Sequence, residues 1–203
     1  RGCSDTGHLA AGEDPTAPRT PGHEFANSVR RFSCVRHPIA DGRADDPLRR
    51  AVGRLLAGEI LAVKGLGGYH LAVRADHEPS VARLRAAKHR EDKPFALLVA
   101  DLPAAGALVH TDAAARELLA GRRRPIVLLP RRAGAGVTAS VAPRTGELGV
   151  MLPPTPLHHL LATDVGRPLV LTSGNVSDEP IAHRDDDAAA RLAPLVDGFL
   201  THD

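Results

Sequence analysis

Short apolar runs that alternate with amphipathic stretches constrain the fold of this 203-residue chain more than any other feature. The apolar runs have the length of buried strands, and the stretches between them carry helical spacing. Strands are predicted at 59–64, 69–73, 94–100, 125–130, 147–152, 168–172 and 198–201, and helices at 46–57, 76–90, 111–120, 155–162 and 185–196. This alternation predicts one α/β domain with a twisted, mixed open sheet and flanking helices.

The beginning of the chain has a different character. Residues 1–44 contain four prolines and no sustained apolar period, so we expect irregular or disordered structure there. At Asp46-Pro47 an acidic cap is followed by a proline, a combination that favours the start of a helix. We therefore assign the folded domain to residues 45–203. Thr111 is a plausible cap for the third predicted helix.

Composition excludes some classes of protein. No apolar run is long enough to cross a bilayer, and the first residues show no apolar core of a secretory signal. The two cysteines, Cys3 and Cys34, are too few for a disulfide scaffold and lack the paired spacing of a zinc site. We expect a cytoplasmic protein with reduced thiols and no contact with a membrane.

A glycine-rich segment, KGLGGYH, lies between the first two predicted strands. It fits neither a phosphate loop of the G-x-x-x-x-G-K-[ST] type nor a G-x-G-x-x-G dinucleotide fingerprint. Gly67 and Gly68 could admit a ligand close to the backbone while Lys64 supplies a positive charge. The alternative is that the glycines only make a tight hairpin or a bulge.

A basic segment, KHREDKP, follows the second predicted helix. Lys88, Arg90 and Lys93, together with His89, gather four basic groups within six residues, which is typical of a phosphate clamp. Cations at the end of a helix are favourable in any protein, so a purely structural role is the alternative.

A polar segment, TSGNVS, follows the apolar strand at 168–172. In α/β sheets, ligands bind beyond the carboxyl ends of strands, so Ser173 and Asn175 are candidate ligand contacts. The alternative is an ordinary polar turn. A nucleophilic Ser173 is disfavoured because no G-x-S-x-G elbow is present. In the preceding GVMLPPTPLHH segment, His158 and His159 are adjacent and make a poor metal pair, so each is interpreted as a core or capping residue.

The order of these segments resembles the YrdC-like domain of the HypF family over residues 45–203. The segments that carry the resemblance are AVKGLGGYHLAV, RAAKHREDKPFALLV, ELGVMLPPTPLHHLL, LVLTSGNVSDEPI and VDGFLTHD. The resemblance to the YrdC and Sua5 threonylcarbamoyl-AMP synthases is more distant, because their P-T-D-T-x-Y-G-L signature is replaced here by VKGLGGYHL.

This resemblance implies a YrdC/Sua5-like fold and a module that forms carbamoyl-AMP from carbamate and ATP, with Mg²⁺ bound to the ATP. Lys88 and Arg90 would be catalytic, and no residue is assigned to a dedicated metal site. The nucleotide would be bound by Lys64, Gly67, Gly68, Lys88, Arg90, Lys93, Ser173 and Asn175.

In the HypF family this domain accompanies acylphosphatase and Kae1-like domains, and a HypE-type protein accepts the carbamoyl group during [NiFe]-hydrogenase maturation. We expect the present chain to be part of such a larger carbamoyltransferase and not to complete the transfer alone. Two alternatives stay open, a threonylcarbamoyl-AMP synthase-like enzyme of tRNA modification and a module that binds double-stranded RNA. One Tyr and four Phe offer little base stacking, which disfavours RNA. A degenerate remnant without ligands is a third alternative.

Overall fold

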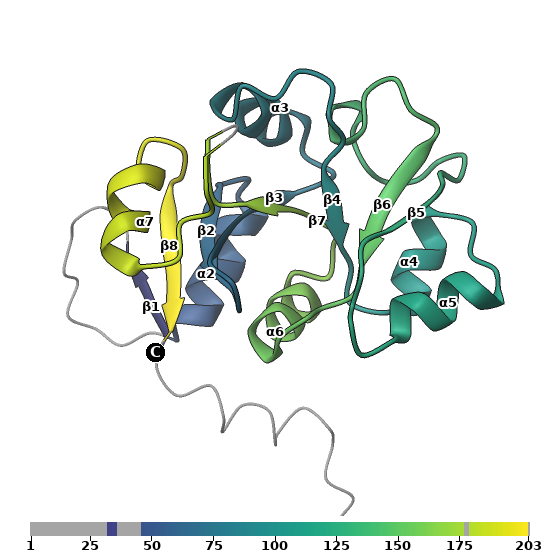
Figure 1. Ribbon diagram of the computed structural model, residues 1–203, viewed down its shortest axis with the longest axis horizontal. Helices are drawn as coiled ribbons and strands as arrows, with labels where there is room; N and C mark the ends of the chain where they lie inside the picture. The colour runs from purple at the N-terminus through teal and green to yellow at the C-terminus, as the bar shows by residue number, and fades with distance from the viewer. Residues whose placement is uncertain (1–31, 36–45, 177–178, 203) are drawn as a thin grey trace, which may run out of the picture.

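The computed structural model describes residues 32–35, 46–176 and 179–202, which form one open sheet flanked by helices (Figure 1). The strands are β1 (Phe32–Val35), β2 (Leu61–Lys64), β3 (Tyr69–Arg74), β4 (Ala96–Leu98), β5 (Val127–Pro130), β6 (Glu147–Met151), β7 (Leu169–Ser173) and β8 (Gly198–His202). The helices are α2 (Pro47–Leu56), α3 (Glu78–Ala87), α4 (Leu102–Leu108), α5 (Ala113–Ala120), α6 (Pro156–Val165) and α7 (Asp185–Leu192), with a 3₁₀ turn η1 (Ala139–Val141).

The sheet has eight described strands in the order β1-β8-β2-β3-β7-β4-β6-β5. The pairs β2–β8 and β4–β6 are parallel, and the other neighbours are antiparallel. The predicted α/β class with a mixed open sheet is therefore confirmed.

Each face of the sheet buries its own apolar core. On one face, α2 and α6 pack through Leu55 and Leu161 against strand residues that include Val63 and Leu171. On the other face, α3, α4, α5 and α7 cover a larger core. Full burial of one such leucine stabilises the fold by about 1.5–3 kcal/mol. A strand that turned these side chains to solvent would lose this energy, so the alternation along each strand determines which side chains face which core.

Helix caps explain where most of the helices begin. The side chain of Asp46 accepts a hydrogen bond from the Leu48 amide at 3.0 Å, as predicted for the start of α2. Thr155 caps α6 in the same way. For α5 the prediction was wrong: Asp112, and not Thr111, accepts from the Ala115 amide at 2.7 Å. The short helix α4 was not predicted, because its small residues (LPAAGAL) give little apolar periodicity.

Strand β1 lies within the segment that was expected to be irregular. It pairs antiparallel with β8 at the edge of the sheet. The expectation was therefore wrong for Phe32–Val35, whereas residues 1–31 and 36–45 lie outside the described part of the chain. None of the described helices is long and apolar enough to cross a bilayer.

Candidate functional site

A cavity of about 440 Å³ opens on the sheet face that α2 and α6 partly cover. The register of the strands places its side chains on one face, because His70 pairs with Ser173 and Ala96 lies between Leu171 and Gly149. The cavity thus extends from β3 across β7, β4 and β6 to β5. Its lining residues are His70, Arg90, Pro94, Phe95, Ala96, Ile126, Leu128, Gly149, Met151, Leu171, Thr172 and Ser173.

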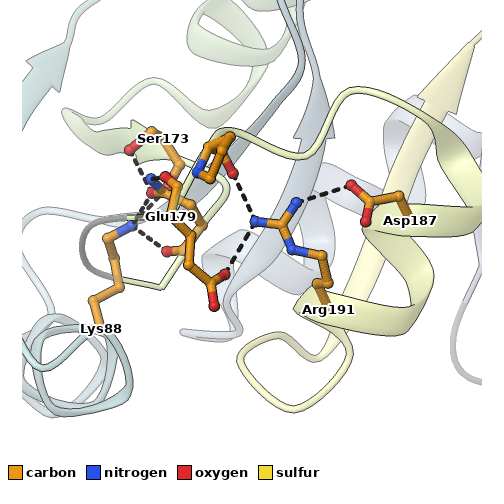
Figure 2. A network of polar contacts seen from close by, with 7 residues as sticks. Lys88, Ser173, Glu179, Asp187 and Arg191 are labelled. Carbon is orange, nitrogen blue, oxygen red and sulfur yellow. Dashed lines mark hydrogen bonds and ion pairs between the residues drawn. The ribbon is translucent and has the colours of Figure 1, made fainter.

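Lys88 follows α3 and is buried, with only 2 % of its surface exposed. Its ammonium donates to the Ser173 carbonyl at 2.7 Å, the Asn175 carbonyl at 2.6 Å and the Asn175 Oδ1 at 2.9 Å (Figure 2). Burial, and then the neighbouring charge of Arg90, lower the pKa of Lys88 to about 8.

Ser173 lines the cavity, and Asn175 lies beside it in the segment that Lys88 supports. The Ser173 hydroxyl donates to the Asn175 Oδ1 at 2.7 Å, and the Asn175 Nδ2 donates to the Glu179 carbonyl at 2.5 Å. Arg191 of α7 forms an ion pair with Glu179 in this segment and a second one with Asp187, one turn earlier on its own helix (Figure 2). Ser173 and Asn175 are therefore held by Lys88 at the end of α3, and Glu179 by Arg191 of α7.

Arg90 lines the cavity over the ring of Phe95, with the guanidinium carbon 5.0 Å from the ring centroid. Its Nε donates to the Lys93 carbonyl at 2.8 Å and its Nη2 to the Pro94 carbonyl at 2.6 Å. A guanidinium has five N–H donors, so these two bonds orient the group and leave donors available for an anionic ligand.

Arg85 organises the same loop and was missed by the sequence analysis. Its Nη1 donates to the carbonyls of Arg90, Glu91 and Lys93 at 2.8–3.2 Å, and its guanidinium also lies 4.5 Å from the centre of the Phe95 ring. The only signal in the sequence was its place within the basic cluster before Lys88. The loop conformation thus depends on a side chain outside the motif.

Lys64 does not join Arg90 and Ser173. It pairs in register with Tyr69, which places it on the sheet face opposite to His70. Its ammonium forms an ion pair with Asp185 at 2.7 Å, and the Tyr69 hydroxyl donates to the same carboxylate at 2.8 Å. The side chain of Lys93 is exposed outside the cavity, although its carbonyl binds both arginines of the loop.

The two glycines that were assigned to the ligand have different environments. Gly68 has a φ of +141°, and a Cβ there would lie 2.6 Å from the Ala182 carbonyl oxygen. A Cβ at Gly67 would have no atom within 4 Å. The backbone conformation at position 68 therefore requires glycine, whereas Gly67 faces open space.

Two histidines meet at the β3 end of the cavity. His158 is fully buried in the first turn of α6, with its Nδ1 2.6 Å from the Thr155 hydroxyl, which confirms its interpretation as a core residue at a cap. His70, which the sequence analysis did not select, packs edge to face against it. A lone histidine within a strand gave no signal of such a pair.

A second and larger cavity, of about 760 Å³, lies beyond the carboxyl ends of β4 and β6. It is lined in part by Arg122, Arg124 and the exposed His159, and it contains none of the predicted site residues. The convergence of Arg90, Ser173 and the segment held by Lys88 therefore identifies the smaller cavity as the candidate site.

Comparison with known proteins identifies the family. The profile of the Sua5/YciO/YrdC family, described as telomere recombination, matches residues 54–203. The chain belongs to this family. The resemblance that the motifs indicated is thus confirmed, and with it the YrdC/Sua5-like fold.

Within the family the chain is similar to carbamoyltransferases. It is 46 % identical to carbamoyltransferase HypF2 of Cupriavidus necator over 173 residues, which cover 78 % of this chain and 21 % of the relative. It is 32 % identical to a threonylcarbamoyl-AMP synthase of Stenotrophomonas maltophilia, over 75 % of this chain and 84 % of that protein.

A crystal structure of full-length HypF in the phosphate- and nucleotide-bound form superposes with a TM-score of 0.80 and 38 % identity, over 85 % of this chain and 22 % of the other. The chain therefore corresponds to about a fifth of the length of these HypF relatives.

Proposed function

We propose that this chain is the adenylate-forming module of a carbamoyltransferase, which binds ATP and condenses it with carbamate to carbamoyl-AMP and pyrophosphate. The observation that carries the proposal is the order of chemical groups along the cavity. An apolar end on β5 is followed by Arg90 and Ser173 and then by His70 on β3. An acyl-adenylate has the same order, from the base through the phosphate to the acyl group.

The β5 end suits the adenine base. Ile126 and Leu128 are 55 % and 64 % exposed, which is high for large apolar side chains. Gly149 of β6 pairs with Leu128, and a Cβ at Gly149 would lie 3.0 Å from Ile126 Cγ2. A flat apolar ring placed here would cover surface that is otherwise in contact with water.

The middle of the cavity suits the phosphates. Arg90 supplies a planar donor group, and the buried charge of Lys88 stands directly behind the Ser173 segment. A carbamate oxygen would attack the α-phosphorus in line, the new O–P bond would form, and pyrophosphate would leave with the electron pair of the broken P–O bond. These cations would stabilise the charge that develops on the phosphate oxygens.

Mg²⁺ is included in the proposal because ATP carries it and it neutralises the leaving pyrophosphate. Within the described ranges, no three carboxylate, histidine or cysteine side chains converge on a metal site. The ion would therefore be held through the ATP phosphates. We keep Lys64, Lys93, Gly67 and Gly68 as proposed contributors near the nucleotide; for Lys64 this role requires exchange of its ion pair with Asp185.

The wider assignment follows from the relatives. Because this chain matches about a fifth of the HypF proteins, we propose that it works beside acylphosphatase and Kae1-like domains in a cytoplasmic enzyme. The final acceptor would be a HypE-type protein in [NiFe]-hydrogenase maturation. Threonylcarbamoyl-AMP formation is the second candidate, supported by the 32 % identity to a synthase of which the chain covers 84 %.

Calorimetric titration with ATP and Mg²⁺ tests the nucleotide site. We expect saturable binding by the wild type, a loss of about tenfold or more in affinity for Arg90→Ala, and no loss for Arg49→Ala. Arg49 is an exposed arginine on α2 and makes a matched control for the change in charge. Equal affinities of the wild type and Arg90→Ala would refute the assigned phosphate position.

Exchange of labelled pyrophosphate into ATP then identifies the acyl substrate. We expect exchange that depends on ammonium bicarbonate, which supplies carbamate in equilibrium, and not on threonine with sodium bicarbonate. The reverse dependence would establish the threonylcarbamoyl alternative instead.

A further inference from the structure

The histidine pair at the β3 end of the cavity has no part in the phosphate site. His70 lies on β3 and lines the cavity, and His158 is fully buried on α6. Their ring centroids are 5.6 Å apart and the rings are inclined by 78°. His70 therefore borders the cavity at the end opposite to the apolar Ile126 and Leu128, and His158 packs against His70.

One nitrogen of each ring is buried without a hydrogen-bond partner among the described residues, and in His158 it is Nε2. His70 Nδ1 is buried without a hydrogen-bond partner among the described residues, and a Cβ on Gly65 would lie 2.6 Å from it. This nitrogen thus faces the Gly65 backbone. The Nε2 atom is the remaining ring nitrogen through which His70 can bind a ligand in the cavity.

The surroundings also decide where the ring proton lies. Burial lowers the pKa of His70 and, with the charges of His70 and His202, lowers the pKa of His158 to about 4. Both rings are therefore uncharged at neutral pH. A buried N–H without an acceptor is rarer in proteins than a buried lone pair, and a lone pair can accept a weak contact from a Cα–H group. The proton of His70 is thus assigned to Nε2.

From this geometry we propose that His70 is the carbamate-binding residue, which donates its Nε2–H to the carbamate oxygen that does not attack ATP, and that His158 positions its ring. This inference rests on the proposed function. An uncharged donor has a chemical advantage here. A proton delivered to the carbamate nitrogen would break the C–N bond and release ammonia and carbon dioxide, whereas a neutral imidazole orients the anion without supplying that proton.

The ring also limits the size of the substrate. His70 borders the cavity on β3, and His158 behind it is held by Thr155 and cannot withdraw into solvent. The unsubstituted amino group of carbamate fits against such a wall better than a substituted nitrogen. Shortening His70 should therefore relax the selection against N-methylcarbamate.

Three substitutions of His70 separate its hydrogen bond from its bulk. His70→Gln places an N–H donor near the Nε2 position, His70→Asn places one near Nδ1, and His70→Ala removes both. In the ammonium bicarbonate-dependent exchange assay, we expect the KM for carbamate to rise about tenfold or more for Ala and Asn and to be largely restored for Gln. The affinity for ATP should stay within about twofold in all three. His70→Ala should also gain exchange with N-methylcarbamate.

Two results would overturn the proposal: an unchanged KM in His70→Ala, or an equal loss in all three variants, which would indicate a merely structural role. A spectroscopic readout makes the test independent of turnover. In protein labelled with ¹⁵N-histidine, we expect a neutral His70 with its proton on Nε2 at pH 7. Its signal should move when ammonium bicarbonate, but not sodium bicarbonate, is added to the ATP complex.

A charged ring, the opposite tautomer or an unmoved signal would contradict the role of His70. Failure of the proposed function looks different, because ATP binding or all exchange would then be missing from the wild type. Where ATP binds but no exchange occurs, the NMR titration of the ATP complex still decides the carbamate contact.

Discussion

Acid should destabilise this protein through His158. The side chain is fully buried, and burial, followed by the charges of His70 and His202, lowers its pKa to about 4. In the unfolded chain the pKa is about 6.5. Between these two values the unfolded chain binds more protons than the folded one, so stability is lost as the pH falls through this window. The linkage relation gives a loss of about 2 kcal/mol in unfolding free energy between pH 7 and pH 5 from this residue alone.

Urea unfolding followed by far-ultraviolet circular dichroism measures this loss, since the chain has no Trp to report by fluorescence. His158→Phe removes the titrating group and should reduce the pH dependence by about 2 kcal/mol. His159→Phe, an exposed neighbour on the same helix, should keep the dependence of the wild type. If the wild type and His158→Phe lose equal unfolding free energy between pH 7 and pH 5, His158 is not held uncharged and the reasoning fails.

Three further predictions concern the loops of the site. Gly68→Ala should lower the free energy of unfolding by about 1–3 kcal/mol, because the φ of Gly68 is +141° and a Cβ there would meet the Ala182 carbonyl. Gly67→Ala should change the free energy of unfolding by less than about 0.5 kcal/mol. Equal melting temperatures of the two variants in calorimetry would contradict this difference. ATP affinity should fall by up to about tenfold from pH 7 to pH 9 as Lys88, with its pKa of about 8, loses its proton, and Lys88→Met should bind weakly with a flatter profile in the same titration. Arg85→Lys keeps the charge but not the fork that holds the loop carbonyls, so ATP binding should weaken about tenfold; wild-type affinity in calorimetry would argue against that role.

The sequence predicted the elements better than their contacts. The apolar runs predicted β3 and β7 correctly, because a buried strand is indicated by a short apolar run that ends at turn-forming residues. The motifs also pointed to Lys88 and Asn175, which the fold brings into hydrogen-bond contact across 87 positions. The partners of each side chain could not be predicted in this way. They depend on strand register and on residues far away in the chain.

Lys64 shows the difficulty most clearly. Its face of the sheet follows from the pairing with Tyr69, and its charge is taken up by Asp185, more than a hundred positions later. Nothing in the KGLGGYH motif specifies either contact. The sheet face of His70, six positions after Lys64, could not be predicted for the same reason. A shift of one residue in strand register moves every side chain of the strand to the opposite face.

The electrostatic attraction of the site for a polyphosphate therefore depends on which oxygens hold each cation. Lys64 is held by a carboxylate, so its charge is largely cancelled. Lys88 donates to two backbone carbonyls and an amide oxygen, which orient its ammonium group. Its neighbour Arg90 is also a cation, and their repulsion contributes to the low pKa of Lys88. An anionic phosphate bound at Arg90 would offset this repulsion and raise that pKa. By linkage, protonation of Lys88 and binding of the nucleotide must then favour each other, so the strained pair of charges is itself part of the affinity for ATP.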